Sequence, residues 1–365
     1  MIKYIDDFRA ADLIARVAAA IKSNNPGGPV NLMEVCGGHT ITIHKFNLSG
    51  FLPENINLLS GPGCPVCVTS NEFIDKALII SKIPDVIITT FGDLVRVPGS
   101  HSSLLQAQAE GADIRICYSP ADALTIAADN SHKQIVFLGI GFETTAPLIA
   151  AAILNAEKQS LTNFSVLSAL KTMPPVMRAL LQSGELALDG FICPGHVSAI
   201  TGIHIYEFIV QEYGIPCVVT GFEPLDLMTA ILFLIEMINA KRPAVVNQYN
   251  RVVKPEGNQK AMEVLRKVFE PCDAVWRGLG NIPDSGLKPK PEYASYDADL
   301  RFSVSVAPSK ENPACLCGVV LRGISKPSDC PLFAKVCTPA NPQGACMVSA
   351  EGACATYYKY GKKHD

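Results

Sequence analysis

The stretch QIVFLGIG, residues 134–141, carries the pattern from which the fold can be predicted. It is almost wholly apolar, short enough to be one strand, and followed by a helix-like stretch at residues 146–158. Seven similar apolar runs occur elsewhere in the chain: VNLMEVCGG, INLLSGPG, DVIITTFGD, ADIRIC, FSVLSA, DGFICPG and IPCVVTG. Between them lie five more helix-like stretches, at residues 71–82, 103–110, 121–128, 176–182 and 200–213. Apolar strands that alternate with helices predict an α/β fold with parallel sheets covered on both faces.

A weak internal repeat suggests that this α/β region has two halves. Three pairs of residues align with the same separation of 104 positions: His39 with Glu143, Asp85 with Asp189, and Asp122 with Asp226. The second strand of each half needs an offset of 108 positions, and chance agreement between strand-rich segments is the alternative. We expect two similar lobes that face each other across a cleft, because ligands bind outside the carboxyl ends of parallel strands.

The end of the chain has a different composition. After about residue 240, proline, glycine and asparagine interrupt the sequence, and from residue 315 cysteines are frequent while apolar residues are sparse. Such a segment depends on a bound metal to stay folded. The expected domains are a first lobe at residues 1–128, a second lobe at 129–240 and an iron-sulfur cluster domain at 241–365.

Composition and charge exclude several classes of protein. Hydrophobic residues make up 48% of the 365 residues and charged residues 18%, which favours an ordered protein. The net charge is −3 and no long basic run is present, so nucleic acid is not an expected partner.

The expected location is the cytoplasm. The amino terminus, MIKYIDDFRA, carries acids where a signal peptide needs positive charge, and the apolar stretch at 227–238 is too short to cross a membrane. We expect that stretch to be a buried helix. Thirteen cysteines in a chain without an export signal are read as reduced thiols, ligands or redox groups.

Four cysteines near the end of the chain form the strongest candidate metal site. They follow the pattern C-x6-C-x8-C-x7-C, and the prolines and glycines between them allow loops to wrap around an ion. Thiolates bind iron-sulfur clusters or zinc, and the spacing lacks the close pairs of a zinc knuckle. Buried free cysteines are the alternative. The set is Cys330, Cys337, Cys346 and Cys354, with Cys315 and Cys317 as reserve ligands.

A second cysteine motif, GPGCPVC at residues 61–67, follows a predicted strand. Thr69 and Glu72 fit a capping box at the start of the next helix, and a helix amino terminus stabilises thiolates. Cys64 and Cys67 are therefore a candidate redox dithiol. Metal ligands or inert loop thiols are the alternatives.

Further candidates stand at other predicted strand ends. Cys36 and His39, in CGGHT, offer a thiolate and an imidazole for a transition metal, although a cysteine at a strand end is often merely buried. Glu143 brings a carboxylate to the corresponding place in the second half, or it caps the next helix. His196, in PGHVS, is a candidate ligand or proton carrier, although a lone histidine is usually structural.

Five motifs stand in one order along nearly the whole chain: CGGHT at 36–40, GPGCPVC at 61–67, GFETT at 141–145, PGHVS at 194–198, and DCPLFAKVCTPANPQGACMVSAEGACATYYKYG at 329–361. Together they resemble the HypD family of nickel-iron hydrogenase maturation proteins. Ala350 stands where that family often has serine, and this departure affects no candidate ligand.

The resemblance implies a scaffold that is a monomer on its own and that joins the small partner HypC to build an iron centre. That centre, Fe(CN)2CO, carries cyanide and carbon monoxide, and HypE would supply the cyanide. Carried over to this sequence, Cys36 would hold the iron together with a cysteine of HypC. His39, Glu143 and His196 would lie near the iron.

The resemblance also implies two redox sites. Cys64 and Cys67 would be a redox pair. A 4Fe-4S cluster would be held by the four cysteines near the end of the chain, Cys330, Cys337, Cys346 and Cys354. The alternative functions are a stand-alone iron-sulfur and dithiol oxidoreductase, and an interaction module stapled by zinc.

Overall fold

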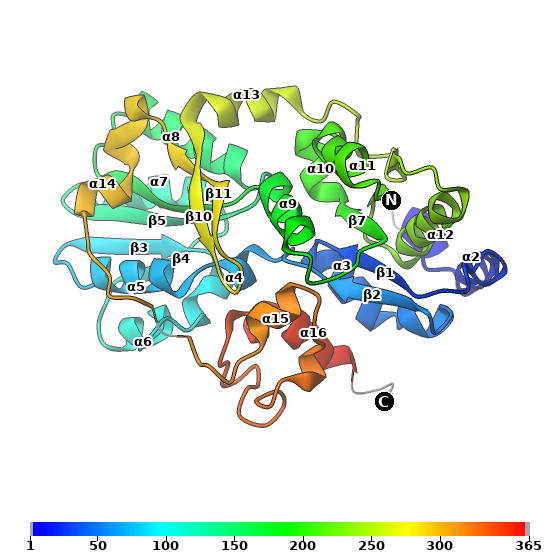
Figure 1. Ribbon diagram of the computed structural model, residues 1–365. Coiled ribbons are helices and arrows are strands. Elements are labelled where there is room, and N and C mark those ends of the chain that lie inside the picture. The colour runs from blue at the N-terminus through cyan, green and yellow to red at the C-terminus, as the bar shows by residue number, and fades with distance from the viewer. Residues whose placement is uncertain (1–2, 310, 362–365) are drawn as a thin grey trace.

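The computed structural model describes residues 3–309 and 311–361, which form two α/β lobes side by side with the cysteine-rich segment below them (Figure 1). The first sheet has the strand order β2 (Ile56–Ser60), β1 (Val30–Glu34), β7 (Gly190–Pro194), β8 (Cys217–Thr220), β9 (Val245–Asn247). The second sheet has the order β4 (Ile114–Ile116), β3 (Val86–Thr90), β5 (Gln134–Gly141), β6 (Phe164–Leu170). Every neighbouring pair in both sheets is parallel. The predicted α/β class and all eight predicted strands are confirmed.

The order of the strands gives the internal repeat a structural meaning. The offsets of 104 and 108 positions map β1, β2, β3 and β4 onto β5, β6, β7 and β8. The order β2-β1-β7-β8 of the first sheet then matches the order β6-β5-β3-β4 of the second. The two lobes are therefore similar, and each contains one strand pair from each half of the repeat.

Membership of the sheets differs from the division expected at residues 128 and 129. The chain leaves the first sheet after β2, builds the whole second sheet from residues 86–170, and returns to the first sheet with β7. The boundary expected at residue 240 also differs from the sheet, because β9, at Val245–Asn247, is the last strand of the first sheet. A repeat read along the sequence does not reveal that the two halves have exchanged strand pairs.

Helices cover both faces of each sheet. In the first lobe, α12 (Pro224–Ala240) packs on β7, β8 and α2 (Ala11–Ser23), and its apolar residues are buried as expected of the stretch at 227–238. The other helices of this lobe are α3 (Gly37–Lys45), α10 (Gly195–Thr201) and α11 (Glu207–Tyr213). The second lobe and its border with the first contain α5 (Asn71–Ile80), α6 (Leu104–Ala109), α7 (Pro120–Asp129), α8 (Ala146–Lys158) and α9 (Met173–Ser183).

The helix expected at residues 200–213 was wrong as a single element. The chain turns at Gly202, whose φ is +80°, and α10 ends there. A short 3-10 turn, η3 (His204–Tyr206), then leads into α11.

The segment after β9 contains a hairpin that the sequence did not reveal. Helix α13 (Gln259–Val268) leads into the antiparallel strands β10 (Phe269–Trp276) and β11 (Gly280–Pro289), which cross the second lobe on its side toward α9 (Figure 1). Proline at 271, 283 and 289 concealed the strand pattern, since proline weakens such a prediction. Part of this segment packs on the second lobe through Leu265, Phe269 and Leu287.

The remaining elements are short. Before the hairpin they are α1 (Lys3–Asp7), η1 (Leu48–Phe51), α4 (Pro65–Val68) and η2 (Gly92–Arg96). After it they are η4 (Pro291–Tyr296), α14 (Ala298–Phe302), α15 (Cys317–Leu321), η5 (Pro327–Asp329), η6 (Ala345–Met347) and α16 (Ala353–Tyr360). Within residues 3–309 and 311–361, no helix has the length and apolar character needed to span a membrane.

Candidate functional site

Three neighbouring strands of the first sheet end at one cluster of side chains. Cys36 follows β1, His196 follows β7, and Phe222 follows β8, and these strands are adjacent and parallel. The Cys36 Sγ lies 3.6 Å from the His196 Nδ1. The ring of Phe222 lies 5.4 Å from that of His196, centroid to centroid. The structure thus brings together two candidates from distant motifs, because the carboxyl ends of parallel strands share one edge.

Cys36 is a buried thiol in an environment that disfavours its charged form. It is 1% exposed and stands immediately before α3. Burial, followed by the carboxyls of Glu351 and Glu34, raises the pKa of the Cys36 thiol, while the backbone N–H groups of Gly38 and His39 oppose that shift. A metal ion that binds this sulfur would supply the missing positive charge.

His39 lies on α3, one turn from Cys36, and is fully buried. Its Nε2 is 3.0 Å from the carbonyl oxygen of Gly221, and its ring stacks on Phe222 with centroids 4.9 Å apart. Its Nδ1 is buried and has no hydrogen-bond partner among the described residues. Burial lowers the pKa of His39 to about 3 and that of His196 to about 4, so both rings are neutral near pH 7.

The dithiol motif forms a short helix, α4. Cys64 and Cys67 are joined in a disulfide, with Cα atoms 5.2 Å apart, and the backbone N–H of Cys67 donates to the Cys64 Sγ at 3.2 Å. Cys64 is the residue before α4, a short helix that was not predicted, whereas the helix to whose start the motif was assigned, α5, begins at Asn71. The expected capping residue was wrong. Ser70 caps α5 by accepting from the N–H of Phe73 at 3.3 Å, whereas the Thr69 hydroxyl donates to the carbonyl of Pro65.

The dithiol loop is packed directly on the Cys36 loop. The N–H of Gly37 donates to the carbonyl of Gly63 at 3.3 Å, and a Cβ at position 63 would come within 3.0 Å of the Cys36 backbone nitrogen. On its other side, α4 lies against η6, and Cys67 and Cys346 belong to one buried cluster.

The cysteine-rich segment gathers its thiols around Cys317. Interactions with the thiols of Cys315, Cys346 and Cys354 lower the pKa of the Cys317 thiol. Gly344 lies so close that a Cβ there would approach the Cys317 and Cys315 sulfurs within 3.0 Å. Cys317, Cys330, Cys337, Cys346 and Cys354 are buried, and Cys315 is half-buried. The two reserve ligands therefore lie among the thiols of the predicted set.

The chemistry of this donor set fits an iron-sulfur cluster, since such clusters take four thiolates. A zinc site would also accept thiolates. Across the described ranges, no three cysteine, histidine or acidic side chains are already arranged around a metal position. Cluster ligation stays a prediction.

Residues 10–361 match the family described as "Hydrogenase formation hypA family", HypD. The chain is 48% identical to "Hydrogenase maturation factor HypD2" of Bradyrhizobium diazoefficiens, covering 100% of this chain and 98% of that protein. It is 46% identical to "Hydrogenase maturation factor HypD" of Cupriavidus necator, over 100% and 98% of the two chains. It is 42% identical to the protein of that description from Escherichia coli, over 98% of each chain.

The chain belongs to the HypD family. The resemblance drawn from the five motifs is confirmed, and membership of this family supports a role in hydrogenase maturation. The HypD motifs CGGHT, GPGCPVC and PGHVS occupy adjoining loops, at the ends of β1, β2 and β7.

The HypD motif GFETT lies at the end of β5, in the second lobe. Glu143 accepts from the N–H of Met173, the first residue of α9, at 2.8 Å, so it does not cap the next helix. Its Oε2 is buried without a hydrogen-bond partner in the described ranges, and burial raises the pKa of Glu143 to about 7. Among the hydrogen bonds, ion pairs and ring contacts of the described residues, none joins Glu143 to Cys36 or to either histidine.

Two residues near the Cys36 loop were missed. Glu34, 1% exposed, accepts hydrogen bonds from the N–H of Cys36 at 2.8 Å and from the Thr40 hydroxyl, and burial raises its pKa to about 8. Glu34 could have been selected from the sequence, because it is the single acidic residue inside the apolar run VNLMEVCGG. Phe222 was missed because an aromatic side chain in a turn has no metal-binding chemistry of its own.

Proposed function

We propose that this protein is the scaffold on which the Fe(CN)2CO unit of nickel-iron hydrogenases is assembled. Cys36 holds the incoming iron together with a cysteine of HypC, and HypE supplies the cyanide groups. The observation that carries the proposal is the juxtaposition of Cys36 and His196 beside the dithiol loop, in a chain of the HypD family.

The chemistry starts with the Cys36 thiol. Its neutral form is strongly favoured by burial, whereas iron binds the thiolate. His196 is neutral, and its Nδ1 lies 3.6 Å from the Cys36 Sγ. As the sulfur–iron bond forms, the iron supplies the positive charge that stabilises the thiolate. The half-buried His196 accepts the thiol proton transiently and passes it to solvent, because a ring with a pKa of about 4 does not keep it near pH 7.

His39 and Glu143 have different parts in the proposal. The Nδ1 of His39 is a buried lone pair without a partner in the described chain, and we assign it to binding the incoming iron directly, since imidazole nitrogen is a common ligand of transition metals. We assign Glu143 to proton storage at the carboxyl ends of the second sheet, since a pKa of about 7 suits exchange of a proton near neutral pH.

The two sulfur sites supply electrons in this scheme. Cys64 and Cys67 interconvert between disulfide and dithiol, with two electrons and two protons per cycle. A 4Fe-4S cluster held by Cys330, Cys337, Cys346 and Cys354 would provide one-electron chemistry beside the dithiol. The packing of α4 on η6 supports this assignment.

Infrared spectroscopy of the chain co-purified with HypC tests the proposal. Cyanide and carbonyl stretches are expected in the wild-type complex and absent with Cys36→Ala, while absorption of the cluster is unchanged. Cyanide bands that persist in Cys36→Ala would contradict the role of Cys36. Turnover of a small substrate by the isolated chain would instead favour a stand-alone oxidoreductase.

A further inference from the structure

The turn between β8 and α12, residues 221–223, places an aromatic ring against the Cys36 cluster. The Phe222 ring stacks on His39 with an interplanar angle of 29° and lies 5.4 Å from the ring of His196. A Cβ at Gly38 would lie 3.0 Å from the Phe222 Cδ1 and 3.6 Å from the Cys36 Sγ. The ring thus forms one wall of the cluster, and Gly38 provides the space for it.

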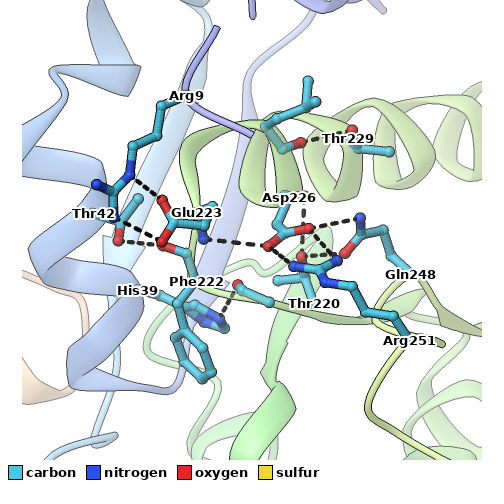
Figure 2. Close-up of polar contacts among 12 residues, drawn as sticks. Arg9, His39, Thr42, Thr220, Phe222, Glu223, Asp226, Thr229, Gln248 and Arg251 are labelled. Carbon is cyan, nitrogen blue, oxygen red and sulfur yellow. Dashed lines mark hydrogen bonds and ion pairs between the residues drawn. The ribbon is translucent and has the colours of Figure 1, made fainter. Parts of the chain in front are cut away.

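The same turn presents two successive carbonyl groups to α3 (Figure 2). The Gly221 oxygen lies 3.0 Å from the His39 Nε2, and the Thr42 hydroxyl donates to the Phe222 oxygen at 2.6 Å. A carbonyl oxygen only accepts hydrogen bonds, so the His39 Nε2 must carry the proton. The Nδ1 is then left as the lone pair, and this is the buried nitrogen without a partner in the described ranges.

Ionic contacts hold the turn from two sides (Figure 2). Arg9, from the amino-terminal segment, donates to both carboxylate oxygens of Glu223, at 2.5 and 2.9 Å. Asp226, which is fully buried, accepts from the Glu223 N–H at 3.3 Å and from Arg251 at 2.6 and 2.8 Å. The position of the Phe222 ring is therefore set by contacts outside the cluster.

We propose that Phe222 is a positioning residue of the iron site: its ring and its turn hold His39, three residues after Cys36, in the Nε2–H tautomer, with Nδ1 as its buried lone pair. This inference rests on the proposed function, because it concerns the same iron. An aromatic wall keeps water from the lone pair, and the carbonyl of Gly221 prevents the ring from flipping. Outer contacts of this kind orient groups around a metal and alter its affinity.

The tautomer is measurable without iron. In the full chain labelled with ¹⁵N-histidine, long-range ¹H–¹⁵N spectra distinguish a protonated ring nitrogen from a bare one, and loss of one signal set in His39→Gln assigns the signals of His39. We expect a pure Nε2–H tautomer in the wild type and a mixture in Phe222→Leu. Phe222→Tyr should restore the wild-type pattern, because it keeps the ring. Phe51→Leu removes an aromatic ring that is 38% exposed and lies outside the cluster, and should change nothing.

The second measurement is the iron retained by the chain co-purified with its small partner. About 10-fold weaker retention is expected for Phe222→Leu, the range found when outer contacts of a metal site are lost. Phe222→Tyr should recover most of it. If Phe222→Leu does not fold, Arg9→Gln releases the turn from a side chain that is 45% exposed, and should give the tautomer mixture by itself.

A wild-type tautomer and wild-type iron retention in the folded Phe222→Leu protein would overturn the proposal. It is overturned as well if Phe222→Leu fails to fold and Arg9→Gln keeps a pure tautomer. Absence of infrared bands from the wild-type complex would instead count against the proposed function, and the tautomer result would still decide the role of Phe222.

Discussion

Gly63, the residue before the dithiol, lies with its backbone against that of Cys36. Its carbonyl accepts from the N–H of Gly37, and a Cβ at position 63 would come within 3.0 Å of the Cys36 nitrogen and Cα. The candidate iron ligand and the redox pair are thus attached to each other through main-chain atoms. A shift of either loop moves the other.

Gly63→Ala should destabilise the protein because the added methyl group meets backbone, which cannot rotate away. We expect a loss of about 2–3 kcal/mol in the free energy of unfolding, in the range of overpacked cores. Urea denaturation followed by circular dichroism measures it. Gly28→Ala is the matched control, since a Cβ there has no neighbour within 4 Å. Equal midpoints for the two variants would contradict the close packing of the loops.

Glu34→Ala should destabilise the Cys36 loop. It leaves the Cys36 N–H and the Thr40 hydroxyl without their buried acceptor, at a cost of about 2–4 kcal/mol. Thermal and urea unfolding measure the loss. Glu54→Ala, at an exposed position, should have little effect. A Glu34→Ala protein as stable as Glu54→Ala would show that these hydrogen bonds contribute nothing.

The buried carboxyl of Glu143 should make stability depend on pH. Burial raises its pKa in the folded protein to about 7, above the ordinary value of 4.5, so the folded state binds the extra proton. The contribution of Glu143 to the free energy of unfolding is complete below about pH 4.5. It falls by roughly 3 kcal/mol as the pH rises to about 7.

Glu143→Gln should remove this dependence. The difference in free energy of unfolding between Glu143→Gln and the wild type is the quantity to measure, at intervals from pH 5 to pH 8. Glu143→Gln should become more stable relative to the wild type as the pH rises. A constant difference would mean that Glu143 ionises with its ordinary pKa.

Cys317→Ser should lower the iron and sulfide content of anaerobically purified protein by half or more, because the Cys317 thiol interacts with those of Cys346 and Cys354, two of the proposed cluster ligands. Cys272→Ser, in the half-buried thiol of β10, should leave both contents unchanged. Undiminished iron and sulfide in a folded Cys317→Ser protein would restrict ligation to the other cysteines.

The elements of the two lobes were predictable because their signals are local. Strands such as β5, which are buried along their length, are visible as apolar runs, and α8 follows with the bounds expected from its composition. The pairing of β1 with β7 was not predictable, because it depends on where the chain returns after the entire second sheet. The hairpin β10–β11 was hidden by its prolines.

The candidate site shows the same limit. Cys36 and His196 could each be selected by residue type and by position at a strand end, but their 3.6 Å contact follows from the exchange of strand pairs between the lobes. Phe222 and Gly63 contribute shape and backbone contact, which a motif does not encode. Cys317 was identified only as a reserve, because spacing alone does not rank six nearby thiols.

The exchange of strand pairs also determines the order in which the two sheets can form while the chain is being synthesised. Strands β3 to β6 are contiguous in sequence, so the second sheet can pair as soon as residue 170 has left the ribosome. Cys36 leaves the ribosome early but gains His196 and Phe222 as neighbours only after β7 and β8 have followed. A nascent chain therefore leaves this thiol without these neighbours while residues 37–222 are synthesised, and premature capture of metal or oxidant is a hazard that the cell must manage.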